Sequence, residues 1–401
     1  MAAHIFRRFS SSAKDLRLGI INNVKIENVG GKFYSTAAEP AQSAVEAART
    51  SIDNPASHTS DQIGLWYTLQ PESVKHLFSY GGLPKTYVTN CKTFAETCLM
   101  VRQPAISCID YIKRSDLTLP PNKFLLYGPE GVGKSLSLAS IIKFLSDDGW
   151  LIVHLPWAVN WRRNFKEIVP SASVPGQYDH PVDATLWLQH FRNQNQTILK
   201  DEQLLTSESY VWSRRETTEA GSPLSSLVEL GMARARFASD CIMALTSELK
   251  QLAINDRVKV AVVIDGINTL FVKESRFRRE DRTYVEPQNF TIYKAFTSLL
   301  HSDWKNGVIL GSLDYTANGP TRRDSHLPRY ILGDKGWELL DPFVPIPVSN
   351  YDEIEMRSAV DYYLDRKWLQ NPAAATDVGR KELAMLSGCN PYSFMTVARS
   401  I

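Results

Sequence analysis

A glycine-rich stretch, residues 125–136, constrains the fold of this chain more than any other feature of its sequence. It reads Leu-Leu-Tyr-Gly-Pro-Glu-Gly-Val-Gly-Lys-Ser-Leu and fits the pattern G-x-x-x-x-G-K-[ST] of a phosphate-binding loop. In such loops a buried strand ends, the backbone turns several N–H groups onto a phosphate, and a helix begins. The flanking sequence fits, since residues 123–127 read as a strand with the apolar run Phe-Leu-Leu-Tyr, and residues 134–145 place apolar side chains at helical spacing.

The loop residues are the candidate nucleotide-binding residues, and two of them carry most of the chemistry. The Lys134 ammonium can reach the β- and γ-phosphates, and the Ser135 hydroxyl can bind Mg²⁺. The loop by itself does not indicate whether the nucleotide is hydrolysed. The candidates are Gly128, Pro129, Glu130, Gly131, Val132, Gly133, Lys134, Ser135 and Leu136.

A second apolar strand supplies a candidate magnesium ligand. Residues 258–265 read Val-Lys-Val-Ala-Val-Val-Ile-Asp, so a buried strand ends in the carboxylate of Asp265. In phosphate-loop proteins a carboxylate at this place lies beside the Mg²⁺ that the phosphates bind. We therefore expect Asp265 and Ser135 to share the metal.

The residue after Asp265 argues against fast hydrolysis. Motor ATPases of this class usually place a glutamate there to polarise the attacking water, whereas this chain has Gly266. Asn268 could orient a water but cannot accept a proton, and a turn-capping role is the simpler interpretation. We assign no catalytic residue. Ser312 and Asp314, at the end of a further strand, are the candidate sensor residues for the γ-phosphate.

The order of apolar segments predicts an α/β fold with a parallel sheet and helices on its faces. Strands are expected at residues 123–127, 150–155, 258–265 and 307–313, and residues 341–348 close the sheet. Helices are expected at residues 90–114, with an interruption at Pro104, and at 184–199, 224–252 and 290–300. Three more, at residues 354–368, 377–387 and 391–401, have the size of a small helical lid.

The first 35 residues differ in composition from the rest of the chain. They are basic, contain a serine cluster and are poor in acidic residues, which is typical of a mitochondrial transit peptide; a disordered basic tail is the alternative. Removing their six basic and two acidic residues lowers the 45 basic and 43 acidic residues of the chain to 39 and 41. Because acidic residues then slightly outnumber basic ones, contacts with nucleic acid must come from local basic patches rather than from the overall charge.

The chain divides into four parts on these patterns. Residues 1–35 are the transit peptide, 36–95 an N-terminal extension, 96–340 the nucleotide-binding domain and 341–401 the C-terminal helical domain. No apolar run of about 18 residues is present, so we expect no transmembrane helix. The five cysteines form no C-x-x-C pair, which favours reduced thiols over a disulfide framework or a zinc site.

Two groups of arginines are open to more than one interpretation. Residues 273–282 read Lys-Glu-Ser-Arg-Phe-Arg-Arg-Glu-Asp-Arg, which suits either contact with RNA phosphates or a solvated loop. Arg322 and Arg323 are further candidates for phosphate contact. The sequence offers no Asn-Lys-x-Asp pattern for binding guanine, which excludes a Ras-like GTPase by motif.

Several segments together resemble the death-associated protein 3 family, mitochondrial small-ribosomal-subunit proteins of the AAA+-like P-loop group. The resemblance covers roughly residues 95–401, and several of its segments are not general features of phosphate-loop proteins. The segments that carry it are residues 100–105, 125–138, 210–219, 221–224, 263–268 and 341–351.

The resemblance implies a fold, ligands and partners. The fold is an AAA+-like P-loop core with an N-terminal extension and a small C-terminal helical domain. The ligand is GTP or GDP with Mg²⁺, held by the phosphate loop and by Asp265. The location is the mitochondrial matrix. The partners are small-subunit rRNA, neighbouring mitoribosomal proteins and a bridge to the large subunit, with no homo-oligomer within the ribosome and a link to apoptosis in animals.

Two other functions compete with a structural ribosomal protein that holds a nucleotide. One is an active AAA+-type mitochondrial NTPase that remodels a partner, and the other is a soluble signalling switch. The glycine at position 266 argues against the motor.

Overall fold

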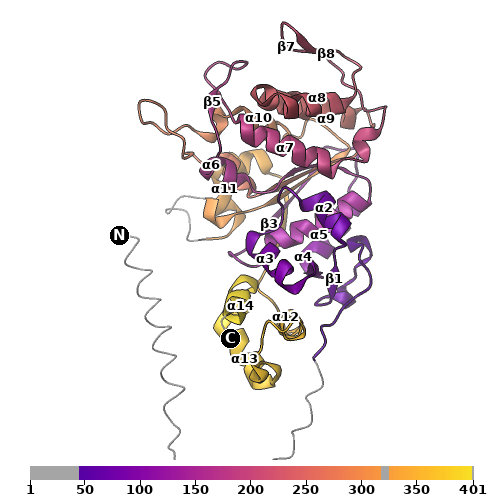
Figure 1. The fold of residues 1–401 in the computed structure, drawn as a ribbon, viewed down its shortest axis with the longest axis vertical. Coiled ribbons are helices and arrows are strands. Elements are labelled where there is room, and N and C mark those ends of the chain that lie inside the picture. The colour runs from indigo at the N-terminus through magenta and orange to yellow at the C-terminus, as the bar shows by residue number, and fades with distance from the viewer. Residues whose placement is uncertain (1–44, 318–324, 400–401) are drawn as a thin grey trace, which may run out of the picture. The chain divides into compact units, whose positions relative to one another are not determined.

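Within residues 45–317 and 325–399, which the computed structural model describes, five strands form a fully parallel central sheet (Figure 1). The strand order is β11-β3-β10-β9-β4. The bounds are β3 Asn122–Tyr127, β4 Leu151–Leu155, β9 Val260–Asp265, β10 Gly307–Ser312 and β11 Val344–Pro347. The expected α/β class with a parallel sheet is confirmed, and the first 44 residues, with the predicted transit peptide, lie outside the described residues.

Alternate residues of each strand point to opposite faces of the sheet. In β9, Val260 and Ile264 belong to one buried cluster, and Ala261 and Val263 belong to the other. Both faces are thus buried, which is why the strands read as continuous apolar runs rather than as alternating ones.

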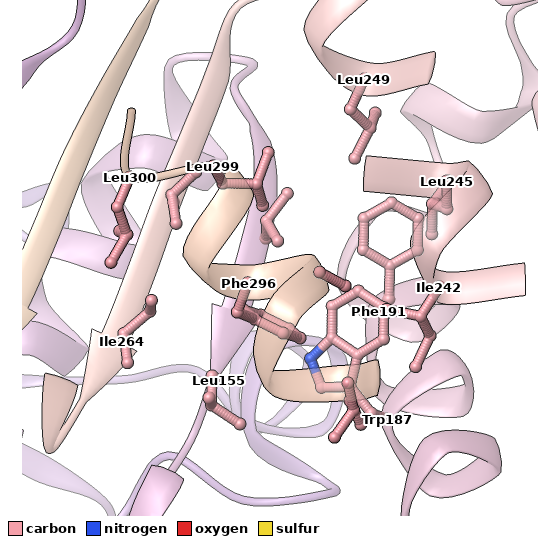
Figure 2. Packing of buried hydrophobic residues seen from close by; sticks show 14 of the residues in the cluster. Leu155, Trp187, Phe191, Ile242, Leu245, Leu249, Ile264, Phe296, Leu299 and Leu300 are labelled. Carbon is pink, nitrogen blue, oxygen red and sulfur yellow. The ribbon is translucent and has the colours of Figure 1, made fainter. Parts of the chain in front are cut away.

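Different helices cover the two faces. One face packs against α7 Pro181–Gln194, α8 Leu224–Ala233, α9 Ala238–Ile254 and α10 Thr291–Ser298. Figure 2 shows Ile264 and Leu155 of the sheet on one side of Phe296, with Trp187 and Phe191 of α7 on the other side. The other face packs against α2 Pro71–Phe78, α4 Gln103–Arg114 and α5 Lys134–Asp147.

Short strands outside the central sheet form antiparallel pairs. β5 (Val169–Pro170) pairs with β6 (Tyr178–Asp179), and β7 (Tyr210–Ser213) pairs with β8 (Glu216–Thr218). Among the described residues, no helix is long and apolar enough to cross a membrane. The remaining bounds are α6 Ala158–Arg163 and α11 Pro328–Leu340.

The prediction of one helix at residues 90–114 is wrong, because a strand lies between two helices in this segment. α3, Lys85–Phe94, ends at Ala95 with a φ of 56°, a left-handed helix end. β2, Cys98–Met100, then pairs antiparallel with β1, Trp66–Thr68, a partner that local pattern does not indicate. Pro104 lies in the first turn of α4, where a proline is favourable, and so does not interrupt a helix.

The single helix expected at residues 224–252 is also wrong. α8 and α9 are separated by a non-helical Arg234, with φ −129° and ψ 83°, and a short 3₁₀ turn at Ala235–Phe237. The turn lets both helices pack against α7. Gly231 permits this close approach, since a Cβ atom there would lie 2.3 Å from Leu188 Cδ1 of α7.

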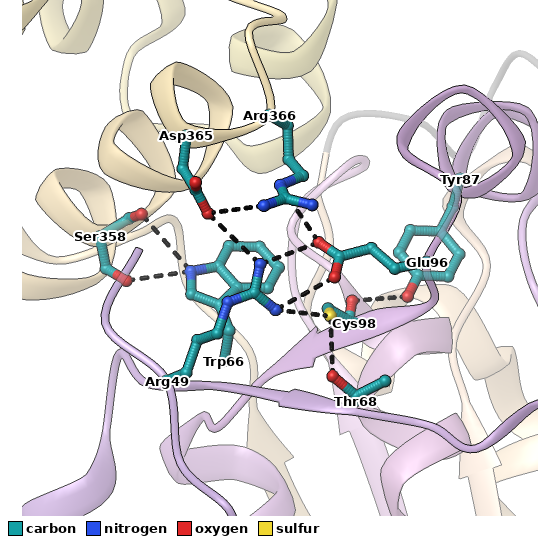
Figure 3. Close-up of polar contacts among 9 residues, drawn as sticks. All are labelled: Arg49, Trp66, Thr68, Tyr87, Glu96, Cys98, Ser358, Asp365 and Arg366. Atoms are coloured by element: carbon teal, nitrogen blue, oxygen red, sulfur yellow. Dashed lines mark hydrogen bonds and ion pairs between the residues drawn. The ribbon is translucent and has the colours of Figure 1, made fainter. Parts of the chain in front are cut away.

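The C-terminal helices share a core with the β1–β2 pair. They are α12 Glu353–Asp365, α13 Asp377–Ser387 and α14 Pro391–Ala398. Trp66 of β1 stacks on Tyr362 of α12. The Nε1 of Trp66 donates to Ser358 Oγ at 3.0 Å (Figure 3). Beside this contact, Arg49 bonds to both Glu96 and Asp365. The division of the chain into four parts stays a prediction. β11 follows residue 340, where the C-terminal helical domain is expected to begin, and is an edge strand of the central sheet.

Candidate nucleotide-binding site

The loop between β3 and α5 is built on three glycines with positive φ. Gly128, Gly131 and Gly133 have φ of 150°, 83° and 98°, a backbone region that L side chains rarely adopt. Gly128 also has no room for a side chain, since a Cβ atom there would lie 2.1 Å from Val348 O. α5 begins directly after Gly133, so the free N–H groups of its first turn lie at the end of the loop. The arrangement is suited to binding a phosphate.

Lys134 folds back over this loop. Its Nζ donates hydrogen bonds to Gly128 O at 2.8 Å and to Pro129 O at 2.7 Å. Burial lowers the pKa of Lys134, and the carboxylates of Asp314 and Asp265 act in the opposite direction. The cation is therefore already inside the loop, where a phosphate could replace the carbonyl oxygens as its partner.

The two candidate magnesium ligands, Ser135 and Asp265, meet at the carboxyl edge of the sheet. β9 ends at Asp265, and the neighbouring strand β10 ends at Ser312, which is paired in register with Asp265. The Ser312 hydroxyl donates to Asp265 Oδ1, and Ser135 hydrogen-bonds to the same carboxylate. Burial raises the pKa of Asp265, whereas these hydrogen bonds lower it.

One hydroxyl and one carboxylate suit a Mg²⁺ that is bound together with phosphates. Magnesium usually takes one or two protein oxygens and completes its octahedron with phosphate oxygens and waters. Ser135 and Asp265 provide such a pair. Within the described residues, no group of three His, Cys, Asp or Glu side chains could hold a metal ion without other ligands.

The two candidate sensor residues make different contacts. Ser312 Oγ accepts a hydrogen bond from the Gly266 N–H at 3.0 Å, in addition to donating to Asp265. The carboxylate of Asp314 accepts from Trp157 Nε1 at 3.0 Å. Both residues line the cavity over the loop, so both lie where a terminal phosphate could reach them.

Asn268 connects the ends of β9 and β10. Its Nδ2 donates to Asp314 O and its Oδ1 accepts from the Asp314 N–H, each at 2.9 Å. The side chain is 1% exposed. These contacts match the turn-capping interpretation of Asn268, since both ends of its amide hold backbone groups.

A cavity of about 390 Å³ extends from the loop toward the C-terminal helices. Of the predicted binding residues, those from Glu130 to Leu136 line it, together with Asp265, Ser312 and Asp314, whereas Gly128 and Pro129 do not. Several aromatic side chains and one amide also line this cavity, and such side chains can contact a planar base. These residues are Tyr87, Asn90, Phe94, Tyr362, Tyr363 and Tyr392.

Sequence reasoning missed Arg102, Asn390 and Tyr392, which contact the loop from outside the glycine pattern. Arg102 donates to Val132 O, Asn390 Nδ2 donates to Glu130 O, and the Tyr392 N–H donates to Gly131 O. The only local indication was the Asn390-Pro391 pair, which is a typical helix start.

The arginine groups lie in different parts of the chain. In the stretch 273–282, Arg276, Arg278, Arg279 and Arg282 are exposed, and the Arg278 guanidinium lies 4.4 Å from the centre of the Tyr284 ring. None of these four lines the cavity over the loop. Arg322 and Arg323 lie outside the described residues.

Comparison with known proteins identifies close relatives across nearly the whole chain. The family model of "Mitochondrial ribosomal death-associated protein 3" matches residues 99–397. "Small ribosomal subunit protein mS29" of Mus musculus is 37% identical over 362 residues, which cover 90% of this chain and 92% of that protein. The protein of the same name in Bos taurus is 36% identical over 352 residues, 88% of each chain.

A comparison of structures finds a more distant similarity. A crystal structure of a DNA replication initiation factor aligns with 73% of this chain and 64% of its own, with 11% sequence identity and a TM-score of 0.29. The fold class given above rests on the parallel sheet and the loop.

Proposed function

Since the chain belongs to the mitochondrial ribosomal death-associated protein 3 family, we propose that it is a structural component of the mitochondrial small ribosomal subunit that holds GTP or GDP with Mg²⁺. The single observation that carries the nucleotide site is the convergence of Lys134, Ser135 and Asp265 on one cavity at the end of a glycine loop. The ribosomal role is supported by the relatives named small-subunit protein mS29. The guanine base is supported by the family resemblance.

In this proposal the nucleotide stabilises the fold. A ligand that binds only the native state adds to its stability in proportion to the logarithm of its concentration over Kd. Mg²⁺, when bound, would neutralise phosphate charge between Ser135 and Asp265. Gly133 and the first turn of α5 would supply N–H donors, and Lys134 would supply a positive charge.

An active NTPase that remodels a partner is the second candidate. The residue that follows Asp265 is Gly266, with a left-handed φ of 77°, so no carboxylate stands there to polarise a water. The Asp314 carboxylate lines the cavity but already accepts hydrogen bonds from Trp157 and Thr316. We therefore propose turnover far below that of a motor ATPase.

The proposed location is the mitochondrial matrix, and the proposed partners are small-subunit rRNA, neighbouring ribosomal proteins and a bridge to the large subunit. Exposed arginines of the 273–282 stretch support RNA contact, since Arg278 is stacked on the Tyr284 ring and so presents an ordered cation to solvent. The apoptotic link implied by the family resemblance stays a prediction.

The test of the proposed function is the small molecule released when the purified full-length protein is denatured. We expect about one guanine nucleotide per chain. Lys134→Ala and Asp265→Asn should lower nucleotide occupancy and the melting temperature together, because each removes a group that faces the phosphates or the metal. Lys335→Ala, at an exposed position of α11, is the control and should change neither.

Three results would contradict the proposal. One is a wild-type protein that binds no nucleotide. Another is an empty Lys134→Ala protein that melts and sediments with small subunits as wild type does. The third is hydrolysis near 1 s⁻¹, on the order of the turnover of known kinases, which would favour the NTPase.

A further inference from the structure

Arg102 lies outside the glycine pattern and yet contacts the phosphate loop directly. It precedes α4 and is 8% exposed. Its Nη1 donates to Val132 O at 2.6 Å, and its Nη2 donates to Ser349 O at 3.0 Å. The same guanidinium bonds to Glu355 of α12 through Nε at 2.8 Å and through Nη2 at 2.9 Å. One side chain thus joins the loop, the segment after β11 and the first C-terminal helix.

The partner of Arg102 is itself held in place. Glu355 is 4% exposed and belongs to the capping box at the start of α12, where Asp352 accepts from its backbone N–H. The positive end of the helix favours the carboxylate at this position. Tyr351 lies beside the pair, with its ring centre 5.0 Å from the guanidinium carbon. A forked, buried pair of this kind fixes orientation as well as distance.

The bond to Val132 O sets the direction of the next peptide group. In a trans peptide the C=O and the following N–H point in opposite directions. With Val132 O directed at Arg102, the N–H of Gly133 points away from it. Gly133 and Arg102 both line the cavity over the loop, so the bond fixes the orientation of a peptide group in the wall of that cavity.

Other C-terminal residues contact the same loop. Val348 O lies against Gly128, where it leaves no room for a Cβ atom. Asn390 Nδ2 donates to Glu130 O at 2.9 Å, and the Tyr392 N–H donates to Gly131 O at 3.1 Å. The C-terminal helices are therefore attached to the loop itself, which a freely moving lid would not be.

We propose that Arg102 is a positioning residue for the nucleotide phosphates, and that the Arg102–Glu355 pair couples the shape of the phosphate loop to the docking of the C-terminal helices. The inference rests on the proposed nucleotide binding and adds to it a residue that no loop pattern contains. Coupling of this kind is reciprocal: if helix docking improves nucleotide binding, bound nucleotide must tighten helix docking.

The decisive variant removes both charges of the pair. Replacing one partner would leave a buried charge unpaired, whereas replacing both with apolar residues of similar size is often neutral for stability. The double variant Arg102→Met with Glu355→Leu should therefore fold but lose the bond to Val132 O. A matched control is Arg380→Met with Asp361→Leu, an ion pair of 2.6 Å between α13 and α12. Neither Arg380 nor Asp361 lines the cavity.

The first measurement is the affinity of the full chain for Mg²⁺ with GDP by titration calorimetry. We expect Arg102→Met/Glu355→Leu to bind roughly 10- to 100-fold more weakly, the range found in metal sites when the groups that orient the ligands are removed. The control pair should bind as wild type does. Affinity equal to wild type in the first double variant would overturn the positioning role and leave Arg102 a purely structural residue.

Arg102→Lys provides a second variant in case the double variant does not fold. A lysine keeps the positive charge beside Glu355 but cannot hold Glu355, Val132 O and Ser349 O in one planar fork. We expect near-native melting of the nucleotide-free protein with weakened GDP binding. If Arg102→Lys binds GDP as wild type does, charge alone suffices and the proposed fork is wrong.

A nucleotide-independent measurement separates this inference from the proposed function. Hydrogen exchange followed by mass spectrometry should show faster exchange in residues 128–136 of the Arg102 variants and unchanged exchange there in the Arg380 control. A wild-type protein that binds no nucleotide would refute the proposed function, and the exchange result would then decide alone whether Arg102 orders the loop. Equal loop exchange in wild type and variants would refute the positioning role.

Discussion

Gly128 is the residue at which the phosphate loop tolerates least change. Its φ is 150°, and a Cβ atom would lie 2.1 Å from Val348 O, a backbone atom that a rotamer change cannot move aside. The glycine is therefore needed twice, once for the backbone conformation and once for the close approach of the segment after β11. This second requirement comes from a contact 220 residues further along the chain, between positions 128 and 348.

We predict that Gly128→Ala lowers stability by at least about 2 kcal/mol and greatly weakens nucleotide binding. Backbone strain of this kind costs on the order of 1–3 kcal/mol, and displacement of Val348 adds to it. Gly149→Ala is the matched control, because Gly149 also has a positive φ, of 72°, but no atom lies within 4 Å of its added Cβ. Urea unfolding and GDP titration of both variants measure the difference. Equal stabilities would mean that the contact with Val348 adds nothing to the backbone strain.

At the scale of elements, the β1–β2 pair is the structure that joins the N-terminal extension to the C-terminal helices. A two-stranded sheet is marginally stable by itself. Here Trp66, Cys98 and Met100 are buried against α12 residues, and Arg49 bridges Glu96 and Asp365 beside them (Figure 3). The pair and the helices therefore stabilise each other.

We predict that Trp66→Ala destabilises the protein by about 3–5 kcal/mol, the usual range for truncating a buried aromatic side chain. The variant loses the stacking on Tyr362, whose ring centre is 4.0 Å away, and the bond to Ser358. Trp66→Phe keeps an aromatic ring but not the hydrogen bond to Ser358, so its stability should lie between those of wild type and Trp66→Ala. Chemical unfolding measures the free energy of unfolding of each protein. A Trp66→Ala protein within 1 kcal/mol of wild type would show that the β1–β2 pair does not contribute to stability in this way.

At the scale of the whole molecule, buried histidines make stability depend on pH. His154 of β4 and His190 of α7 bond to each other at 3.1 Å between sheet and helix, and His180 is fully buried among aromatic rings. Burial lowers the pKa of His180 to about 4 and that of His190 to about 3. The folded protein thus keeps these side chains neutral under conditions where the unfolded chain binds protons.

We predict that stability falls as the pH drops below about 6.5, the ordinary histidine pKa. Between that pH and the folded values the unfolded state holds more protons, so each histidine contributes a loss of up to about 1.4 kcal/mol per pH unit. Thermal unfolding at pH 7.5, 6.5, 5.5 and 5.0 measures the slope. His180→Phe, which retains an aromatic ring beside Phe290, should reduce it. An unchanged slope in that variant would exclude His180 as a contributor.

The sequence by itself determined the features that depend on neighbouring residues. The glycine loop, the helix after it and the strands of the parallel sheet follow from local spacing: glycines permit positive φ, and apolar runs predict strands buried on both faces. The same spacing predicts Ser135 and Asp265 as ligands of one metal, and the fold brings these two side chains into hydrogen-bond contact. Local pattern also predicted the helix at Asp377–Ser387 with its observed bounds.

Only the tertiary structure decided the features that depend on distant partners. Cys98–Met100 is a strand because β1 lies beside it, and the segment 224–252 bends because α8 and α9 both pack on α7. Arg102 and Glu355 are separated by 253 positions, and no local periodicity relates them. A local sequence pattern specifies the conformation of a segment but not which other segment will cover it. The residues outside the glycine pattern that hold the phosphate loop could therefore be found only in the folded chain.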